Sequence, residues 1–197
     1  EAFRKQLKTL EKNGEKFTEK QITDFYNQGL AITEELDAGF DKYFGTDFEF
    51  IKAEDTLMEG IGEFTDAPYN FMGYIDLIIK TKDGKYHIID YKSCSWGWDA
   101  KKRSDRMVTY QLTLYKRYWS QKMGIPLDQI ETHFALLKRT AKAGQKVEIF
   151  RVTSGPRKTT NALNLLKKAL YNVNTQNHMK NRLSCRKCEF FNTPHCT

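Results

Sequence analysis

The segment Gly73–Ser93, GYIDLIIKTKDGKYHIIDYKS, consists of two strand-like runs joined by a turn, and it decides the fold. Each run carries an aspartate, Asp76 in the first and Asp90 in the second, and the second run adds Lys92. Burying such groups costs free energy unless they pair with one another or bind a metal ion. Their placement in the most strand-like part of the chain is therefore the first indication of a functional site.

The turn between the two runs determines whether the aspartates can act together. A two-residue turn would place Asp76 opposite Tyr91 and direct the two carboxylates to opposite faces. A three-residue loop, Lys82-Asp83-Gly84 with Gly84 left-handed, places Asp76 directly opposite Asp90. Because strand side chains alternate, one face then carries Tyr74, Asp76, Ile78, Ile88, Asp90 and Lys92. The other face, predicted to be core, carries Ile75, Leu77, Ile79, His87, Ile89 and Tyr91.

Two carboxylates so close together repel each other and take up a proton unless a cation lies between them. Hard oxygen ligands of this kind suit Mg²⁺ or Mn²⁺. Such an ion can activate water and stabilise charge on a phosphoryl oxygen, and Lys92 on the same face can orient the attacking water. The alternative is a structural ion pair between aspartate and lysine on a half-exposed strand.

The chain has 197 residues, of which 40% are hydrophobic and 13% aromatic. This length and composition are typical of one globular domain. No apolar run approaches the roughly 18 residues of a membrane span, and no signal peptide is visible. The formal net charge of +7 suits a polyanionic partner such as nucleic acid, although a solubilising surface explains it equally well.

Apolar periodicity and turn residues predict the element order α-β-β-β-β-α-β-β-α. The predicted helices cover 18–44, 104–123 and 156–175. The predicted strands cover 47–54, 56–64, 71–81, 86–93, 131–139 and 146–152. This order indicates an α/β (α+β) fold with a mixed central sheet flanked by helices. We expect a charged N-terminal segment at 1–16, the main domain at 17–180 and a cysteine-rich C-terminal clasp at 181–197.

The pair GYIDLII and HIIDYKS resembles the D…(D/E)xK signature of the PD-(D/E)XK nuclease superfamily. The resemblance implies a restriction-endonuclease-like core that cleaves phosphodiester bonds with Mg²⁺ or Mn²⁺. It also implies that Asp76, Asp90 and the backbone carbonyl of Tyr91 bind the metal, and that Lys92 is the catalytic lysine.

The following helix carries YQLTLYKRYW, in which Gln111 and Tyr115 resemble the QxxxY element of the RecB-like branch. These two residues lie one turn apart on one helical face, and the resemblance implies that they handle substrate or position the lysine. RecB-like nucleases often carry a histidine four residues after a glycine on the first helix, and lambda-type exonucleases carry a glutamate there. Here the residue is Thr33. Asp37 and Glu54 are the remaining candidates for a further metal ligand.

The C-terminal segment CRKCEFFNTPHC contains Cys185, Cys188 and Cys196, a spacing typical of a soft-metal site. It resembles the cysteine triplet of iron–sulfur nucleases of the AddB and CRISPR-adaptation types, which implies a [4Fe–4S] cluster. Those proteins have a fourth cysteine before the first helix, and this chain does not. Cys94 can substitute, the fourth ligand can lie upstream of the chain, or the metal can be Zn²⁺ with His195. Free thiols in a reducing cell are the other alternative.

The sequence therefore predicts an intracellular, cytoplasmic, metal-dependent DNA exonuclease that acts on single-stranded ends, encoded by a virus or mobile element. A loop with Trp96 and Trp98 and the basic residues Lys101, Lys102, Arg103 and Arg106 can guide and stack a strand; the tryptophans can equally anchor the loop in the core. The chief alternative is a nucleic-acid-binding subunit without turnover, which Thr33 favours. An unrelated hydrolase fits poorly because no Ser or His nucleophile constellation is present.

Overall fold

The computed structural model describes residues 1–61, 69–177, 179 and 182–196. The chain forms two compact units, Glu1–Thr159 and Thr160–Thr197. Helix α5 (Pro156–Asn174) begins in the first unit and continues into the second, where the short 3-10 helix η2 (Arg182–Lys187) follows it. Among the described residues, no helix combines the length and the apolar character needed to cross a membrane.

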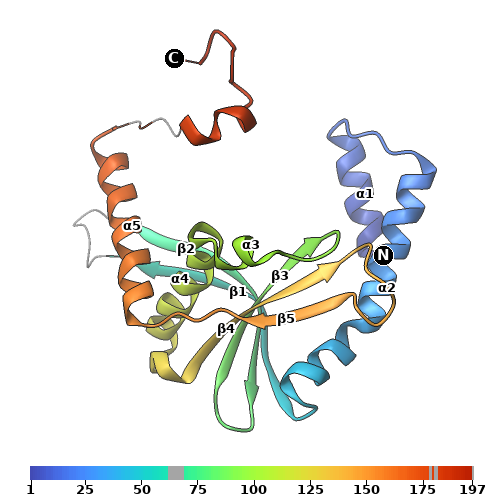
Figure 1. Ribbon diagram of the computed structural model, residues 1–197, viewed down its shortest axis with the longest axis horizontal. Coiled ribbons are helices and arrows are strands. Elements are labelled where there is room, and N and C mark those ends of the chain that lie inside the picture. The colour runs from blue at the N-terminus through green and yellow to red at the C-terminus, as the bar shows by residue number, and fades with distance from the viewer. Residues whose placement is uncertain (62–68, 178, 180–181, 197) are drawn as a thin grey trace. The chain divides into compact units, whose positions relative to one another are not determined.

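The first unit is built on a five-stranded sheet in which sequence order is also spatial order (Figure 1). Its strands are β1 (Phe48–Gly60), β2 (Asn70–Thr81), β3 (Tyr86–Cys94), β4 (Ile130–Lys138) and β5 (Val147–Arg151). Strands β3 and β4 are parallel, and the other three pairs are antiparallel. The mixed sheet flanked by helices that the sequence predicts is therefore confirmed.

Helices α1 (Ala2–Lys12), α2 (Glu19–Phe44), α3 (Ala100–Ser104) and α4 (Arg106–Met123), with the 3-10 turn η1 (Leu127–Gln129), complete this unit. The α2 helix begins at a capping box, in which Thr18 Oγ1 accepts from the Gln21 N–H at 3.2 Å and the Gln21 side chain accepts from the Thr18 N–H at 2.9 Å. Helix α4 lies in the connection between β3 and β4, because parallel neighbours require a long crossover.

Two apolar layers cover the sheet. On the α2 side, Phe40 packs against Leu77, Ile79, Ile89 and Ala135. Helix α4 buries Leu112, Tyr118 and Trp119, and the Trp119 ring lies 5.3 Å from that of Tyr86 on β3. Ile78 and Ile88 are 1% and 0% exposed. The prediction of one core face and one polar face is thus wrong near the turn, because both faces are covered there.

Two predicted boundaries are corrected. Strand β1 is one continuous strand where the sequence predicts 47–54 and 56–64, and residues 62–64 lie outside the described part. The strand is irregular at two places, a register shift between Phe50 and Lys52 and a left-handed Glu54 (φ +50°), but neither ends it. The predicted helix 104–123 begins at Arg106, because Asp105 accepts the Met107 N–H and caps α4, while the preceding loop forms α3.

Candidate active site

The turn between β2 and β3 has the predicted three-residue form. The Thr81 N–H donates to the Lys85 carbonyl at 3.0 Å, the Gly84 N–H donates to the Thr81 carbonyl at 2.9 Å, and Gly84 has φ +82°. The ladder then pairs Lys80 with Tyr86 and ends with Leu77 opposite Ile89. The next residues outward on the two strands are Asp76 and Asp90, as the loop length predicts.

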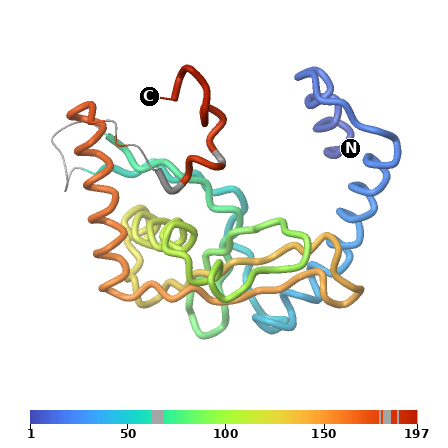
Figure 2. Tube along the Cα trace, turned by 45° about the horizontal axis from the view of Figure 1, so that its top comes forward, coloured from blue at the N-terminus to red at the C-terminus, as the bar shows by residue number. Residues whose placement is uncertain are grey.

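The two aspartates stand where β2 and β3 separate. Beyond Leu77, β2 remains paired with β1, whereas β3 remains paired with β4 (Figures 1 and 2). At this fork the backbone N–H of Tyr91 donates to Oδ2 of Asp76 at 2.7 Å. The Asp76 carboxylate is therefore fixed against the backbone of the neighbouring strand, one residue from Asp90.

The side-chain alternation of β2 reverses close to Asp76. A Cβ on Gly73 would lie against the Tyr115 ring of α4, whereas Leu77, four residues later, packs on α2. In the ladder between β1 and β2, Ala53 lies opposite Leu77 and Asp55 lies opposite Ile75, and Glu54 between them is left-handed. Strict alternation, which would place Ile75 and Leu77 on one face, is therefore wrong here. Irregular strand geometry of this kind often re-aims side chains at functional sites.

Asp90 is a buried carboxylate with one cationic neighbour. It is 2% exposed, and Nζ of Lys92 lies 2.7 Å from its Oδ2. Burial raises the pKa of Asp90, the ion pair with Lys92 opposes that rise, and the negative charge of Asp76 adds to it. The Lys92 ammonium also lies 5.8 Å from the centroid of the Phe134 ring. A second cation beside Asp90 would relieve the repulsion between the two carboxylates.

The donor set fits a hard divalent cation, since carboxylate oxygens are the ligands that Mg²⁺ and Mn²⁺ prefer. Of the other candidates, Asp37 is exposed on α2, and Glu54 is exposed on β1. Burial, followed by the charges of Asp76 and Asp37, raises the pKa of Tyr91 to about 12, so Asp37 lies within electrostatic range. In the described residues neither candidate joins the aspartates in a three-ligand group. The Tyr91 carbonyl stays a prediction.

Gln111 and Tyr115 contact each other on α4. The Gln111 amide donates to the Tyr115 hydroxyl at 3.0 Å, and Tyr115 is 7% exposed. The Tyr115 ring is the neighbour of Gly73, three residues before Asp76, which brings this part of α4 to the fork. Gly73 is not among the site residues predicted from the sequence. A glycine inside a strand is the signal that could have found it, because it often marks close approach by another group.

In the basic loop after β3, some side chains anchor the loop to the sheet and others are exposed to solvent. Trp98 is 8% exposed and packs on Phe134 with ring centroids 5.1 Å apart, so its ring is not available to stack on a base. Arg103 donates to the Trp98 carbonyl at 2.8 Å and pairs with Glu148. These two residues hold the loop. The side chains that remain exposed are Trp96 (75%), Lys101, Lys102 and Arg106.

The C-terminal cysteines are free thiols. Cys188 and Cys196 are exposed, Cys185 is half-buried, and Cys94 in the first unit is also free. Within the described residues, these sulfurs and His195 form no group of three with ligand spacing. The structure therefore gives no support for a [4Fe–4S] cluster or for the zinc alternative at this segment.

The described residues do contain one group of three potential metal ligands, which the sequence pattern did not indicate. His87, Glu131 and His133 bring ligand atoms within 4.8 Å of one another. No local pattern could have found them, because the group is assembled by the parallel pairing of β3 and β4, which are separated by α4.

Comparisons with known proteins bear on the fold and on the family of the chain. A "Putative exonuclease" from Eubacterium rectale shares the fold with a TM-score of 0.58 at 17% identity, over 95% of this chain and 68% of that one. The crystal structure of SSO0001 gives 0.44 at 16% identity, over 86% and 72%. No curated protein matches. The model of the PD-(D/E)XK nuclease superfamily matches residues 4–193. Because that match spans nearly the whole sequence, the chain belongs to the PD-(D/E)XK nuclease superfamily.

Proposed function

We propose that the protein is a Mg²⁺- or Mn²⁺-dependent deoxyribonuclease of the RecB-like branch that removes nucleotides from DNA ends. The observation that carries the proposal is the fork between β2 and β3. There a buried Asp90, its ion-paired Lys92 and a backbone-anchored Asp76 meet at the end of the ladder. A purely structural ion pair would not require a second carboxylate at the same place, since Asp76 raises the pKa of Asp90.

Each residue at the fork has a definite task. A divalent cation between Asp76 and Asp90 would supply Lewis-acid chemistry, lowering the pKa of water and stabilising phosphoryl charge. The Tyr91 N–H holds the Asp76 carboxylate in place. Lys92 can donate from its ammonium group to the attacking water or to a phosphate oxygen. Gln111, through its bond to Tyr115, has a fixed orientation from which to contact the substrate or Lys92.

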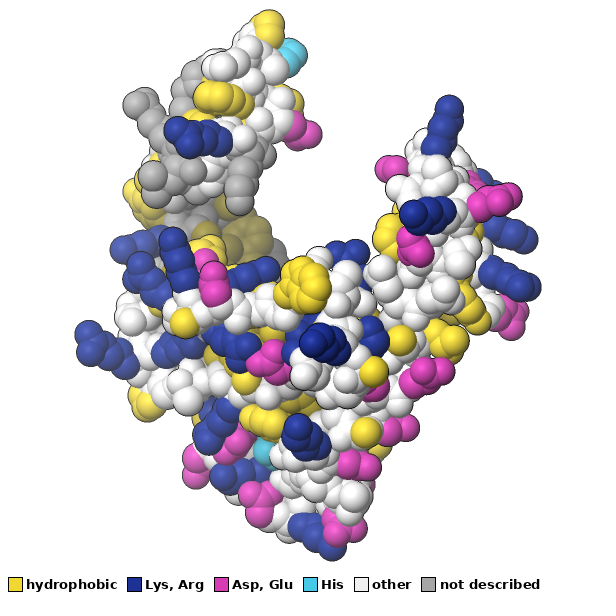
Figure 3. Space-filling model, turned by 45° about the vertical axis from the view of Figure 1, so that its right-hand side comes forward, with side chains coloured by type: hydrophobic (Ala, Val, Ile, Leu, Met, Phe, Trp, Pro, Cys, Tyr) yellow, Lys and Arg dark blue, Asp and Glu magenta, His cyan; other side chains and the backbone are white. Residues whose placement is uncertain are grey.

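The loop that follows β3 supports nucleic acid as the substrate. Trp96 is exposed four residues after Lys92, and Lys101, Lys102 and Arg106 are exposed just beyond it. An aromatic ring and cationic side chains of this kind stack bases and contact phosphates of a single strand. Lys and Arg side chains are spread over the face in Figure 3, so net charge does not distinguish one binding surface, whereas this loop combines an exposed aromatic ring with cationic side chains.

A nucleic-acid-binding subunit with little or no turnover is the second candidate, and Thr33 is the observation that favours it. At the position where RecB-like relatives carry histidine, Thr33 Oγ1 donates to the Gly29 carbonyl of its own helix at 3.0 Å. This residue therefore offers no imidazole or carboxylate toward a metal. Cleavage would then rest on the two aspartates and the lysine.

The deciding experiment measures cleavage of end-labelled single- and double-stranded DNA in Mg²⁺, Mn²⁺ or EDTA. We expect metal-dependent release of nucleotides, complete loss of cleavage in Lys92→Ala, and little change in DNA affinity. Lys82→Ala is the matched control, because Lys82 lies in the turn after β2 and its ion pair with Asp47 is exposed. Undiminished turnover in Lys92→Ala would refute the nuclease mechanism. DNA binding without cleavage in any metal would favour the binding subunit.

A further inference from the structure

A second cluster of ligating side chains lies on the face of the sheet opposite Asp90 and Lys92. In the parallel ladder, His87 is opposite Glu131 and Ile89 is opposite His133. The side chains of His87, Glu131 and His133 therefore project from neighbouring positions on one face. The Phe44 ring of α2 lies 5.1 Å from the His87 ring and 5.2 Å from the His133 ring, which identifies the face as the α2 side.

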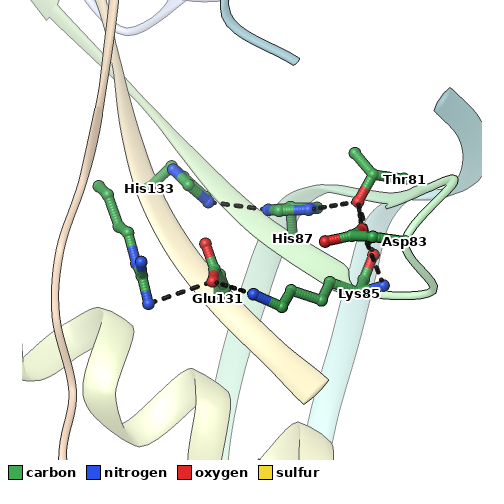
Figure 4. A network of polar contacts seen from close by, with 7 residues as sticks. Thr81, Asp83, Lys85, His87, Glu131 and His133 are labelled. Carbon is green, nitrogen blue, oxygen red and sulfur yellow. Dashed lines mark hydrogen bonds and ion pairs between the residues drawn. The ribbon is translucent and has the colours of Figure 1, made fainter. Parts of the chain in front are cut away.

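Hydrogen bonds connect the side chains of Thr81, His87 and His133 in a chain (Figure 4), and the donor of each bond can be assigned. Thr81 Oγ1 donates to Asp83 at 2.5 Å, so it accepts from His87 Nε2 at 2.8 Å. His87 Nδ1 is then an acceptor, and His133 Nε2 donates to it at 3.0 Å. Among the described residues, His133 Nδ1 has no hydrogen-bond partner and is buried. A single proton therefore separates two imidazole nitrogens that face each other.

The spacing of these two nitrogens is close to that of two histidine ligands of one ion, although both rings must turn so that the nitrogens point at the ion instead of at each other. Zinc–nitrogen bonds are about 2.0–2.1 Å long in a tetrahedral site, so two ligand nitrogens lie about 3.3 Å apart. The nitrogens of His87 and His133 need to separate by only a few tenths of an ångström. The proton between them would move to His133 Nδ1, which keeps the ring neutral but leaves that buried N–H without an acceptor among the described residues. His87 already donates its other nitrogen to Thr81, which is the outer contact that orients histidine ligands.

The protonation states suit metal binding, because an imidazole must be neutral to be a ligand. Burial, followed by the charges of His87 and Arg151, lowers the pKa of His133 to about 3. Burial also lowers the pKa of His87, although the carboxylates of Glu131 and Asp83 oppose that shift. Burial therefore favours the neutral form of both rings.

Glu131 supplies the third donor. Lys85 and Arg151 lie 3.0 Å and 3.1 Å from the same oxygen, Oε1, so neither of these contacts involves Oε2. A cavity of about 610 Å³, lined by all three candidate ligands, has room for water as a fourth ligand. The two cations weaken binding of hard ions that rely on charge. The site therefore favours metals that imidazole binds strongly.

We propose that His87, His133 and Glu131 form a zinc-class transition-metal site, distinct from the Mg²⁺ or Mn²⁺ site expected at Asp76 and Asp90. Zn²⁺ bound there joins β3 to β4 on the α2 face. Its donor set has two nitrogens and one oxygen, with one position left open to solvent. This is the donor set of a site that selects Zn²⁺ over Mg²⁺.

Zinc titration by calorimetry tests the proposal on the full chain carrying Cys185→Ser, Cys188→Ser and Cys196→Ser, which removes the competing thiols. We expect one Zn²⁺ per chain. His87→Gln and Glu131→Gln should each raise the dissociation constant tenfold or more. Thr81→Val keeps all three ligands and removes only the outer contact, which should weaken binding by about 10–100-fold. Circular dichroism establishes that each variant is folded.

Asp90→Asn is the matched control, and we expect it to bind zinc as tightly as its parent. If Asp90→Asn abolishes zinc binding while His87→Gln does not, the zinc occupies the carboxylate site and the proposal is wrong. A folded parent that binds no stoichiometric zinc also overturns it. If His87→Gln does not fold, the Thr81→Val and Glu131→Gln titrations decide, and unchanged affinity in both refutes the site.

Discussion

Gly73 is the position in β2 where a methyl group has no room. A Cβ there would lie 2.6 Å from Cε1 and 3.3 Å from Cδ1 of Tyr115. Non-bonded carbons prefer separations of about 3.5–4.0 Å, so the ring or the strand must move by roughly 1 Å. Overpacking of this kind typically costs about 1–3 kcal/mol. We expect Gly73→Ala to lower the free energy of unfolding by that amount.

The same displacement should reduce cleavage. Moving the Tyr115 ring lengthens or breaks its 3.0 Å bond with Gln111, beside the fork that carries Asp76. A misplacement of about 1 Å near reacting groups can cost roughly 100-fold in rate. The loss of activity should therefore exceed what the loss of stability explains, and it should be visible at temperatures where the variant is fully folded.

Urea denaturation of a double-mutant cycle measures the effect. Tyr115→Ala removes the ring that Gly73→Ala collides with, so the two changes should be non-additive by about 1 kcal/mol or more. Gly60→Ala is the control, because a Cβ at Gly60 of β1 would meet no atom of the described residues within 4 Å. An additive cycle, or a Gly73→Ala protein as stable as the parent, would show that the close approach to Tyr115 is not restrictive.

Three further predictions concern stability. Burial raises the pKa of Asp55, but ion pairs with Lys52 and Lys122 outweigh this, and the pKa lies below its usual value. The resulting stabilisation is complete above the unfolded-state pKa and is lost as pH falls through the folded-state pKa. Asp55→Asn should therefore lower the free energy of unfolding by about 1–3 kcal/mol at pH 7. It should also reduce the fall in the urea midpoint of unfolding as pH is lowered from 5 to 2. An unchanged fall would contradict the ion pairing. Asp90 has a raised pKa, so its charge destabilises the metal-free fold above that pKa, and the penalty disappears as pH falls through it. Asp90→Asn should accordingly melt at a higher temperature than the parent in EDTA at pH 8, and a lower melting temperature would count against this account. Cys188→Ser should leave the melting temperature unchanged in aerobic buffer, since Cys188 is exposed and free. A marked drop, together with iron or zinc bound to the parent protein, would support the predicted metal site in the C-terminal segment.

The central hairpin could be predicted because its determinants are local. Gly84 supplies the left-handed residue that a three-residue loop requires, and the loop length alone sets the register of Leu77 with Ile89. The pattern of apolar residues likewise predicts which segments form strands. By contrast, the reversal of alternation near Asp76 lies beside a left-handed Glu54 in the neighbouring strand, and no apolar pattern within β2 indicates it.

The loop after β3 shows why exposure could not be assigned from composition. Trp96 and Trp98 are two residues apart in one irregular segment, yet they are 75% and 8% exposed. Trp98 is buried because Phe134 of β4 and Phe150 of β5 offer it aromatic neighbours. Both partners come from strands that follow in the chain, and a loop has no periodicity from which to infer a buried side. Sequence alone therefore leaves both roles open for each tryptophan.

Because side chains alternate along β3, this strand presents two different sets of potential metal ligands on its two faces. Asp90 and Lys92 project to one face, where oxygen ligands and an ammonium group suit a hard cation and a phosphate. His87, an odd number of residues away, projects to the other face, where it meets His133 and Glu131. Three residues of extended strand span about 10 Å, so a metal at one place cannot share ligands with a metal at the other. Different donor atoms and opposite faces would thus allow one strand to serve both proposed sites without either metal displacing the other.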